Sequence, residues 1–215
     1  MWLTIWWQLE PSIWAILEMD DCSRNLKKSR TQVSEANHHK NELIHTLHLA
    51  YSGEKAAGYA YNAHWRSVKN PEQRERIQKI EKEEWDHRAI VGEMLAFLGA
   101  KPQVWRELMM ATIGRTVGFS CYIIGWFLPM YFAGRLESAN WREYEVAAFH
   151  ANKLGLFDFE KELMRLSQVE REHELFFLQM VTNHRLLPLL KMFFQWGPES
   201  SSQLPIESST ETTKL

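Results

Sequence analysis

Apolar residues recur at helical spacing over most of the 215-residue chain, with few runs of β-branched residues. Helix-breaking residues interrupt this pattern at three places, which are Asn70-Pro71, Gly99 to Pro102 and Gly155 to Asp158. The stretches between them predict long helices at about 40–69, 72–98, 127–154 and 158–183, and an apolar helix near 103–126. Four long helices with short connections predict an all-α four-helix bundle with additional apolar helices.

The two ends of the chain differ from this pattern. Residues 1–39 form a Trp-rich segment that contains Trp2, Trp6, Trp7 and Trp14. Because Glu10-Pro11 interrupts its apolar stretch, we do not interpret it as a signal peptide. Such a segment either lies at a membrane interface or packs its Trp face onto the core. The tail at 197–215 is polar and is predicted to be disordered, so the bundle is expected to cover 40–196.

A second apolar run covers residues 116–134 and carries no charge over 19 positions. Its length would permit a transmembrane span. The glycines and the proline within it favour packing at a membrane surface or in the core instead. We therefore expect a peripheral protein on the cytoplasmic side of the inner membrane rather than a spanning one.

Charge and cysteine content exclude several classes of protein. The formal net charge is −2 and no dense run of Lys or Arg occurs, so a nucleic acid partner is not expected. Cys22 and Cys121 lie far apart in the sequence, which argues against a disulfide framework and against a thiolate metal site. A reducing compartment fits this cysteine use.

The pattern Glu-x-x-His places two metal-binding side chains on one face of a helix. It occurs four times, at Glu35/His38, Glu42/His45, Glu84/His87 and Glu170/His173. Helix registers separate these copies. In an antiparallel hairpin around Asn70, Glu54 and Glu84 would lie at nearly the same level, whereas Glu42/His45 would lie about 18 Å further along the helix axis. Glu35/His38 falls in a polar stretch that we interpret as a solvated lead-in.

The second half of the chain repeats this plan with Glu137 followed by Glu170/His173. The separation is 30 residues from Glu54 to Glu84 and 33 from Glu137 to Glu170. Tyr61 follows Glu54 by seven positions, as Tyr144 follows Glu137, and both tyrosines are candidates for supporting the ligands. Glu145 is an alternative to Glu137, because "EVAAFHA" resembles "EKAAGYA" at Glu54. The tyrosine repeat favours Glu137.

The predicted metal ligands are therefore four carboxylates and two imidazoles: Glu54, Glu84, His87, Glu137, Glu170 and His173. This is the ligand set of ferritin-like di-iron or di-manganese carboxylate bundles. Carboxylates bridge hard or borderline cations, so two iron ions are preferred, with manganese as the alternative.

These residues resemble the demethoxyubiquinone hydroxylase family of ubiquinone biosynthesis, over about residues 45–180. The likeness rests on "GEKAAGYAY" at 53–61, on Glu84/His87, on "LESANWREY" at 136–144 and on Glu170/His173. The chain departs from the family pattern at Ala50-Tyr51-Ser52, where the family has Asp-His-Ala, and at Leu136, where the family has a glutamate.

The resemblance implies a membrane-associated di-iron mono-oxygenase that uses O₂ to hydroxylate a quinone ring with a lipid-embedded tail. No G-x-G-x-x-G motif occurs, so an external electron donor or a nicotinamide acting directly is required. We expect substrate to enter from the membrane side along Phe119, Tyr122, Trp126, Phe127 and Tyr131. Two alternatives are a ferritin- or rubrerythrin-like iron oxidase or peroxidase, and a non-catalytic membrane-bound scaffold.

Overall fold

The described part of the chain, residues 10–198 of a computed structural model, consists of helices and connections without strands. Side chains are described for residue 30 and from residue 32 onward. The helices are α1 (Glu10–Ser67), α2 (Pro71–Phe97), α3 (Val104–Ser120), α4 (Phe127–Lys153), α5 (Phe157–Val181) and α6 (Leu187–Phe194). The prediction of an all-α helical bundle is confirmed.

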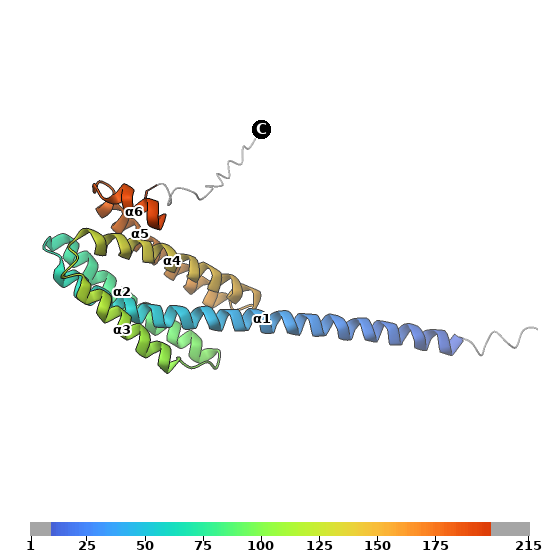
Figure 1. The fold of residues 1–215 in the computed structure, drawn as a ribbon. Coiled ribbons are helices and arrows are strands. Elements are labelled where there is room, and N and C mark those ends of the chain that lie inside the picture. Colours follow the sequence, from blue (N-terminus) through green and yellow to red (C-terminus); the bar gives the residue numbers. More distant parts are fainter. Residues whose placement is uncertain (1–9, 199–215) are drawn as a thin grey trace, which may run out of the picture.

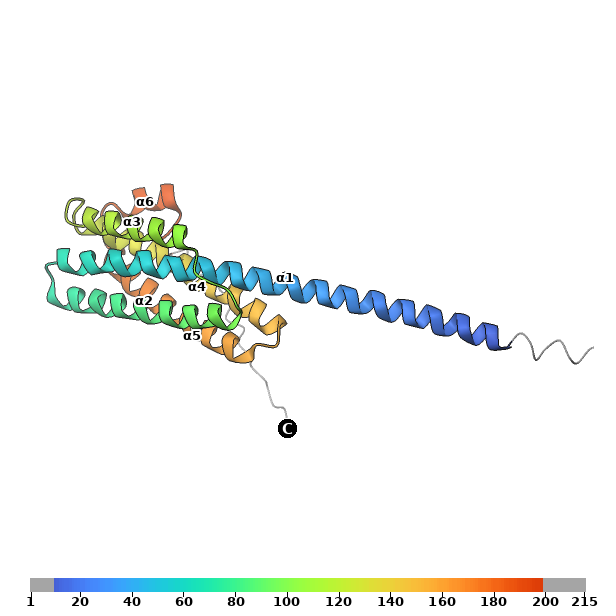
Figure 2. The same ribbon diagram turned by 90° about the horizontal axis from the view of Figure 1, so that it is seen from below.

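The bundle consists of two helical hairpins, α1 with α2 and α4 with α5, which pack together mainly through α1 and α4 (Figure 1). Helix α3 packs along α1. In the view of Figure 2, α3 and α6 lie on one side of the bundle and α2 and α5 on the other. Helices α1 and α4 therefore lie between these two sides.

Local sequence explains where the helices begin and end. The side chain of Asn70 caps α2 by accepting a hydrogen bond from the Gln73 N–H, and Pro71 occupies the first turn, where its missing N–H costs nothing. Gly99 and Gly155 follow the ends of α2 and α4 with φ of 74° and 71°, a conformation that favours glycine. The three predicted breaks are thus confirmed as helix ends.

The structure corrects two predicted boundaries. Helix α3 ends at Ser120, six residues before the predicted end, because the chain turns through 121–126 with Gly125 at φ of 80°. The apolar run 116–134 is therefore divided between α3, a turn and α4. Helix α1 begins at Glu10, so residues 10–39 continue the first bundle helix, which extends beyond the bundle as a single long helix (Figure 1).

Three further points from the sequence concern α6, a membrane-spanning helix and the two ends of the chain. Helix α6 was not predicted as a separate element. Within the described residues, no helix combines the length and the apolar character needed to cross a bilayer. Trp2, Trp6, Trp7 and the tail from residue 199 lie outside the described residues, and so does the side chain of Trp14.

Two apolar clusters fill the bundle core, one toward each end. The first contains Ile77, Ile80, Met130, Phe177 and their neighbours. The second contains Leu47, Val91, Leu95, Leu163, Leu166 and their neighbours. Along each of α1, α2, α4 and α5, the predicted metal ligands fall between the residues of the two clusters, so the ligands are enclosed by apolar side chains from both ends.

Candidate metal centre

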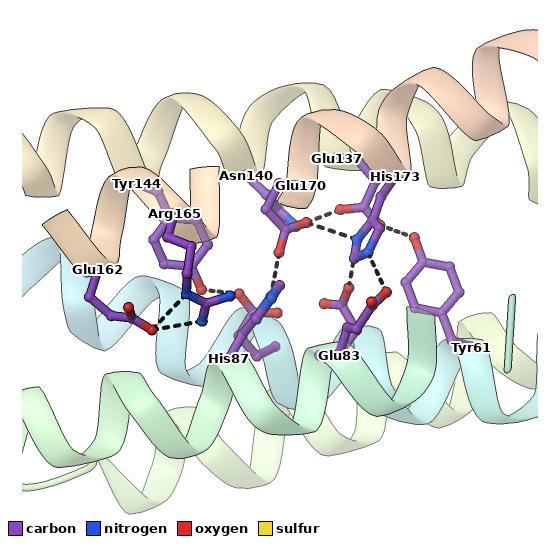
Figure 3. Close-up of polar contacts among 12 residues, drawn as sticks. Tyr61, Glu83, His87, Glu137, Asn140, Tyr144, Glu162, Arg165, Glu170 and His173 are labelled. Carbon is purple, nitrogen blue, oxygen red and sulfur yellow. Dashed lines mark hydrogen bonds and ion pairs between the residues drawn. The ribbon is translucent and has the colours of Figure 1, made fainter. Parts of the chain in front are cut away.

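The six predicted ligands meet in the middle of the bundle. All are buried, with exposed fractions of 3 % or less. Helix α1 contributes Glu54, α2 contributes Glu84 and His87, α4 contributes Glu137, and α5 contributes Glu170 and His173. Figure 3 shows the side chains of α2, α4 and α5 pointing toward one another.

These side chains form two overlapping groups, each of which could hold a metal ion. One group is Glu54, Glu84, His87 and Glu170, and the other is Glu84, Glu137, Glu170 and His173. Within each group, the possible ligand atoms all lie within 4.8 Å of one another. Glu84 and Glu170 belong to both groups, so each could contribute a ligand to an ion held by either group.

The distances between ligand atoms suit such an arrangement. His87 Nδ1 lies 2.6 Å from Glu170 Oε1, and His173 Nδ1 lies 3.4 Å from both Glu84 Oε1 and Glu170 Oε2. Both histidines therefore present Nδ1 to the carboxylates.

Apart from their close contacts with one another, most of the atoms in this cluster have no hydrogen-bond partner within the protein. The unpartnered atoms are both carboxylate oxygens of Glu84 and of Glu170, Oε2 of Glu54, and Nδ1 of His87 and of His173. Leaving so many buried polar atoms unsatisfied would be very unfavourable, since each costs about 1–3 kcal/mol. Bound cations would satisfy them together, so the residues fit a metal centre.

The pKa values show the same conflict between burial and charge. Burial, together with the charge of Glu170, raises the pKa values of Glu84 and Glu137 well above the usual glutamate value. Burial also acts to raise the pKa of Glu170, but His173 and His87 outweigh it, and the pKa of Glu170 is lowered. Without cations the four carboxylates cannot all ionise, and metal binding would release their protons.

The two predicted tyrosines bind the carboxylates in a crossed arrangement. Tyr61 on α1 donates a hydrogen bond to Oε1 of Glu137 on α4, while Tyr144 on α4 donates to Oε1 of Glu54 on α1. Asn140 donates a further hydrogen bond of 3.0 Å to Oε2 of Glu137. Burial and the nearby carboxylates raise the pKa values of both tyrosines well above 10, so both phenols keep their protons.

Sequence reasoning missed Glu83, which supports one of the histidines. Its Oε2 lies 2.9 Å from Nε2 of His173 (Figure 3), on the side of the ring away from the ligand cluster. A carboxylate in this position fixes the tautomer of a ligating histidine and strengthens its binding to metal. Local sequence gives no signal for this role, because it depends on His173 of α5 facing Glu83 of α2 across the bundle.

The remaining sequence candidates lie elsewhere. Glu145 is exposed beside Arg142 and Val146 on the outer face of α4, so it is Glu137 that lies in the cluster. Glu35, His38 and His45 are exposed on α1 and Glu42 is half-buried there; none of them belongs to either group.

An apolar cavity of about 490 Å³ adjoins the centre and lies between α1, α3 and α4. Tyr61 lines it and connects it to the cluster through Glu137. Small residues form much of the wall, among them Ala56, Ala57 and Ala60 of α1 and Gly114 of α3. The cavity is therefore bounded mainly by apolar groups, and Tyr61 separates it from the ligand Glu137.

This cavity is lined by other residues of the run 116–134 than the five predicted to line a substrate path. None of Phe119, Tyr122, Trp126, Phe127 and Tyr131 lines this cavity. Phe127 and Tyr131 are buried in the first apolar cluster, where the Tyr131 hydroxyl donates to the Trp196 carbonyl. The other three are exposed at the end of α3 and in the turn that follows. Because α3 ends at Ser120, Tyr122 and Trp126 lie in the following turn and do not continue the helical face of Phe119.

No family model, curated protein or solved structure matched the chain in the comparisons with known proteins.

Proposed function

We propose that this protein is a di-iron mono-oxygenase that hydroxylates a quinone ring, or a similar hydrophobic ring, in ubiquinone biosynthesis. The observation that carries the proposal combines two features: a buried carboxylate and histidine cluster, and an apolar cavity whose wall residue Tyr61 donates a hydrogen bond to Glu137 of the cluster. A protein that only stores or oxidises metal ions has no need of the apolar cavity.

Iron is the metal that the ligand chemistry favours, with manganese as the alternative. Four carboxylates and two imidazoles suit hard or borderline divalent cations, and two shared carboxylates suit a pair of them. When bound, two irons would supply the reduction of O₂ and the insertion of one oxygen atom into the substrate.

The chain's own residues would bind, orient and shield the substrate. The apolar walls exclude water and accept a ring with an apolar tail. Tyr61 lies between the cavity and Glu137, so a ring placed against Tyr61 would be next to the metal centre. Tyr61 and Tyr144 keep Glu137 and Glu54 in place while retaining their own protons. The electrons would come from an external donor or from a nicotinamide acting directly.

Exposed apolar side chains on α3 and α6 support a membrane-surface location for the proposed enzyme. Trp105 is 77 % exposed and Ile123 is 70 % exposed, at opposite ends of the α3 region, and Phe193 of α6 is 66 % exposed. Both helices lie on the same side of the bundle in the view of Figure 2, whereas in the view of Figure 1 they lie at its two opposite edges. Large exposed apolar patches mark a membrane or a partner, and the tail of a quinone would reach the cavity from that side.

The decisive experiment measures iron and product together. Protein reconstituted with Fe²⁺ without oxygen is expected to bind about two irons per chain. With a reductant, O₂ and a short-chain methoxyquinone, it is expected to form the hydroxylated ring. Glu84→Ala and Glu170→Ala should lose both iron and product, whereas Glu145→Ala should keep both. Iron binding well below one per chain would refute the proposal.

One observation favours the iron-oxidase alternative. A second cleft, of about 540 Å³, reaches His87 between α2 and α5 and is lined by Glu83, Asp86 and Arg165. Its acidic groups would admit Fe²⁺ from solvent. Rapid oxidation of many Fe²⁺ ions per chain, with no product from any quinone, would favour this alternative.

A further inference from the structure

One buried polar atom outside the metal centre also has no partner. Among the described residues, every other buried side-chain nitrogen or oxygen without a hydrogen bond belongs to a predicted metal ligand, and the exception is Nε2 of His64. His64 is 3 % exposed on α1, ten residues after Glu54, and it lines the apolar cavity. Because an unsatisfied buried polar atom destabilises the fold, a histidine at this position needs an explanation.

The neighbours of His64 do not provide one. Its ring stacks with those of Tyr61 and Phe177, with ring centroids 6.2 Å away in each case. Burial lowers the pKa of His64 to about 4, so the imidazole is neutral at physiological pH. A neutral imidazole has one N–H donor and one acceptor nitrogen, and either can serve a ligand. Phenylalanine would provide the same stacking without the unsatisfied nitrogen.

The other polar groups that line the cavity already make hydrogen bonds. The side chains of Ser120 and Cys121 both donate to the Val117 carbonyl, and Tyr61 donates to Glu137. Arg135 Nε donates to the Phe194 carbonyl. Arg135 is exposed, so its remaining N–H groups can reach solvent, and His64 is the buried lining residue with a nitrogen left for a bound molecule.

We propose that His64 is the hydrogen-bonding anchor for a single ring oxygen, a hydroxyl or a carbonyl, on the apolar molecule that fills this cavity. The inference rests on the proposed function only in taking that molecule to be the substrate. His64 lies one helical turn from Tyr61, and Tyr61 contacts Glu137. An oxygen held at His64 places the ring beside Tyr61 and leaves the tail along the wall of α3 and the following turn, which is formed by Ile113, Val117 and Ile124. His64 is thus a positioning and specificity residue.

The test compares two ligands that differ by one hydroxyl: a long-chain alkylphenol and the alkylbenzene of the same chain length. Binding of each to the full-length, iron-loaded protein is measured by calorimetry. His64→Phe should weaken alkylphenol binding about tenfold and leave alkylbenzene binding within about twofold, because only the hydrogen bond is lost. The same variant should raise the melting temperature of the free protein, since it removes an unsatisfied buried atom. His45→Phe, at an exposed position of α1, is the matched control and should change neither affinity.

A second variant protects the test against misfolding. His64→Gln keeps a donor and an acceptor, so it should restore the preference for the alkylphenol that His64→Phe loses. Three results would overturn the anchor. Wild type and His64→Phe could bind the alkylphenol with equal affinity, or the variant could lose affinity for both ligands equally. The third is that wild type binds neither ligand. Failure of the proposed function looks different: selective alkylphenol binding would persist without any hydroxylated product. Conversely, if His64→Phe keeps full hydroxylase activity with an unchanged KM, the anchor role of His64 fails and the proposed hydroxylase function stands.

Discussion

The candidate metal centre is asymmetric at the level of single residues, although the two halves of the chain supply matching side chains to it. His173 has a carboxylate, Glu83, on its outer nitrogen, and Glu83 also pairs with Lys79 at 3.3 Å. The position that corresponds to Glu83 in the second half is Val169, next to Glu170, and the cleft that reaches His87 is lined by this valine. The two histidines are therefore supported differently, and the group that contains His173 should bind its ion more tightly.

Replacement of Glu83 tests this asymmetry. Glu83→Gln should weaken the tighter of two metal-binding steps about 10–100-fold, because His173 loses the carboxylate that orients it. Asp86→Asn removes a charge from the same cleft without touching a histidine nitrogen and is the control. Titration of metal-free protein with Co²⁺, followed by its visible absorption, measures both steps. Equal weakening by both variants would indicate a general effect of charge rather than support of His173.

His64 gives a second prediction, for stability against pH. Its pKa is about 4 in the folded protein and near 6.5 when unfolded, so between these values the unfolded chain binds more protons. Its neutral form therefore stabilises the fold fully above pH 6.5, and this contribution is lost as the pH falls toward 4. From pH 7.5 to pH 5 the loss attributable to His64 is about 2 kcal/mol.

Urea unfolding of metal-free wild type and His64→Phe at these two pH values isolates that contribution, because the other titrating groups are common to both proteins. The variant should lose about 2 kcal/mol less than wild type. Parallel losses in the two proteins would mean that His64 is protonated in the fold as easily as in the unfolded chain.

Sequence reasoning identified the side chains that cluster in the core better than it identified their surroundings. Glu-x-x-His spacing and hairpin register follow from helix geometry alone, so Glu84, His87, Glu170 and His173 could be found without coordinates. Glu83 and His64 could not, because their roles depend on which neighbouring helix faces them. His64 follows an alanine-rich stretch, and nothing in this local sequence indicates that a cavity will form beside the histidine.

At the scale of elements, the cavity depends on how closely α3 approaches α1. A Cβ added at Gly114 would lie 2.3 Å from the backbone oxygen of Ala56, so the two helices are in backbone contact there. Lys55 holds α3 near its beginning through a 3.2 Å ion pair with Glu107, which also pairs with Arg88 of α2. The glycine at position 114 therefore sets the distance between α1 and α3 beside the cavity. The ion pairs of Glu107 hold the beginning of α3 in place.

Gly114→Ala is predicted to destabilise the protein by about 1–3 kcal/mol, since backbone atoms cannot move aside as a flexible side chain would. Gly53→Ala is the matched control. It also lies within a helix that lines the cavity, but its added Cβ meets nothing within 4 Å. That substitution should stabilise the fold by up to about 1 kcal/mol through helix propensity. Denaturant unfolding of both variants measures the difference, and similar free energies would contradict close packing at Gly114.

Helix ends were predictable where a capping residue or a positive-φ glycine marks them, as at Asn70 and Gly155. The end of α3 was not, because the sequence from Val117 to Ile124 stays apolar through the turn and gives no polar signal. The predicted start of the first helix, near residue 40, was wrong for the opposite reason, since α1 begins at Glu10. A polar, charged stretch forms exposed helix as readily as it forms a loop when its helix propensity is high.

For the whole molecule, the distribution of apolar surface decides how the cavity can be reached. Helices α3 and α6 lie on the side of the bundle opposite α2 and α5 (Figure 2), and both expose large apolar side chains. We predict that this face docks on a bilayer. The full-length protein should float with liposomes of zwitterionic and anionic lipid. A triple variant with Trp105→Glu, Ile123→Glu and Phe193→Glu should reduce the bound fraction about tenfold, because each charge opposes burial in the membrane interface. Leu175→Glu, at an exposed position of α5, changes the charge by the same kind of substitution and should leave flotation intact.

A truncated chain that starts near Ser23 separates this face from the Trp-rich start, since loss of flotation on truncation alone would assign docking to the first residues. If the full-length protein stays in the soluble fraction, oxidises Fe²⁺ and acts on no quinone, the hydroxylase proposal fails and the iron oxidase takes its place.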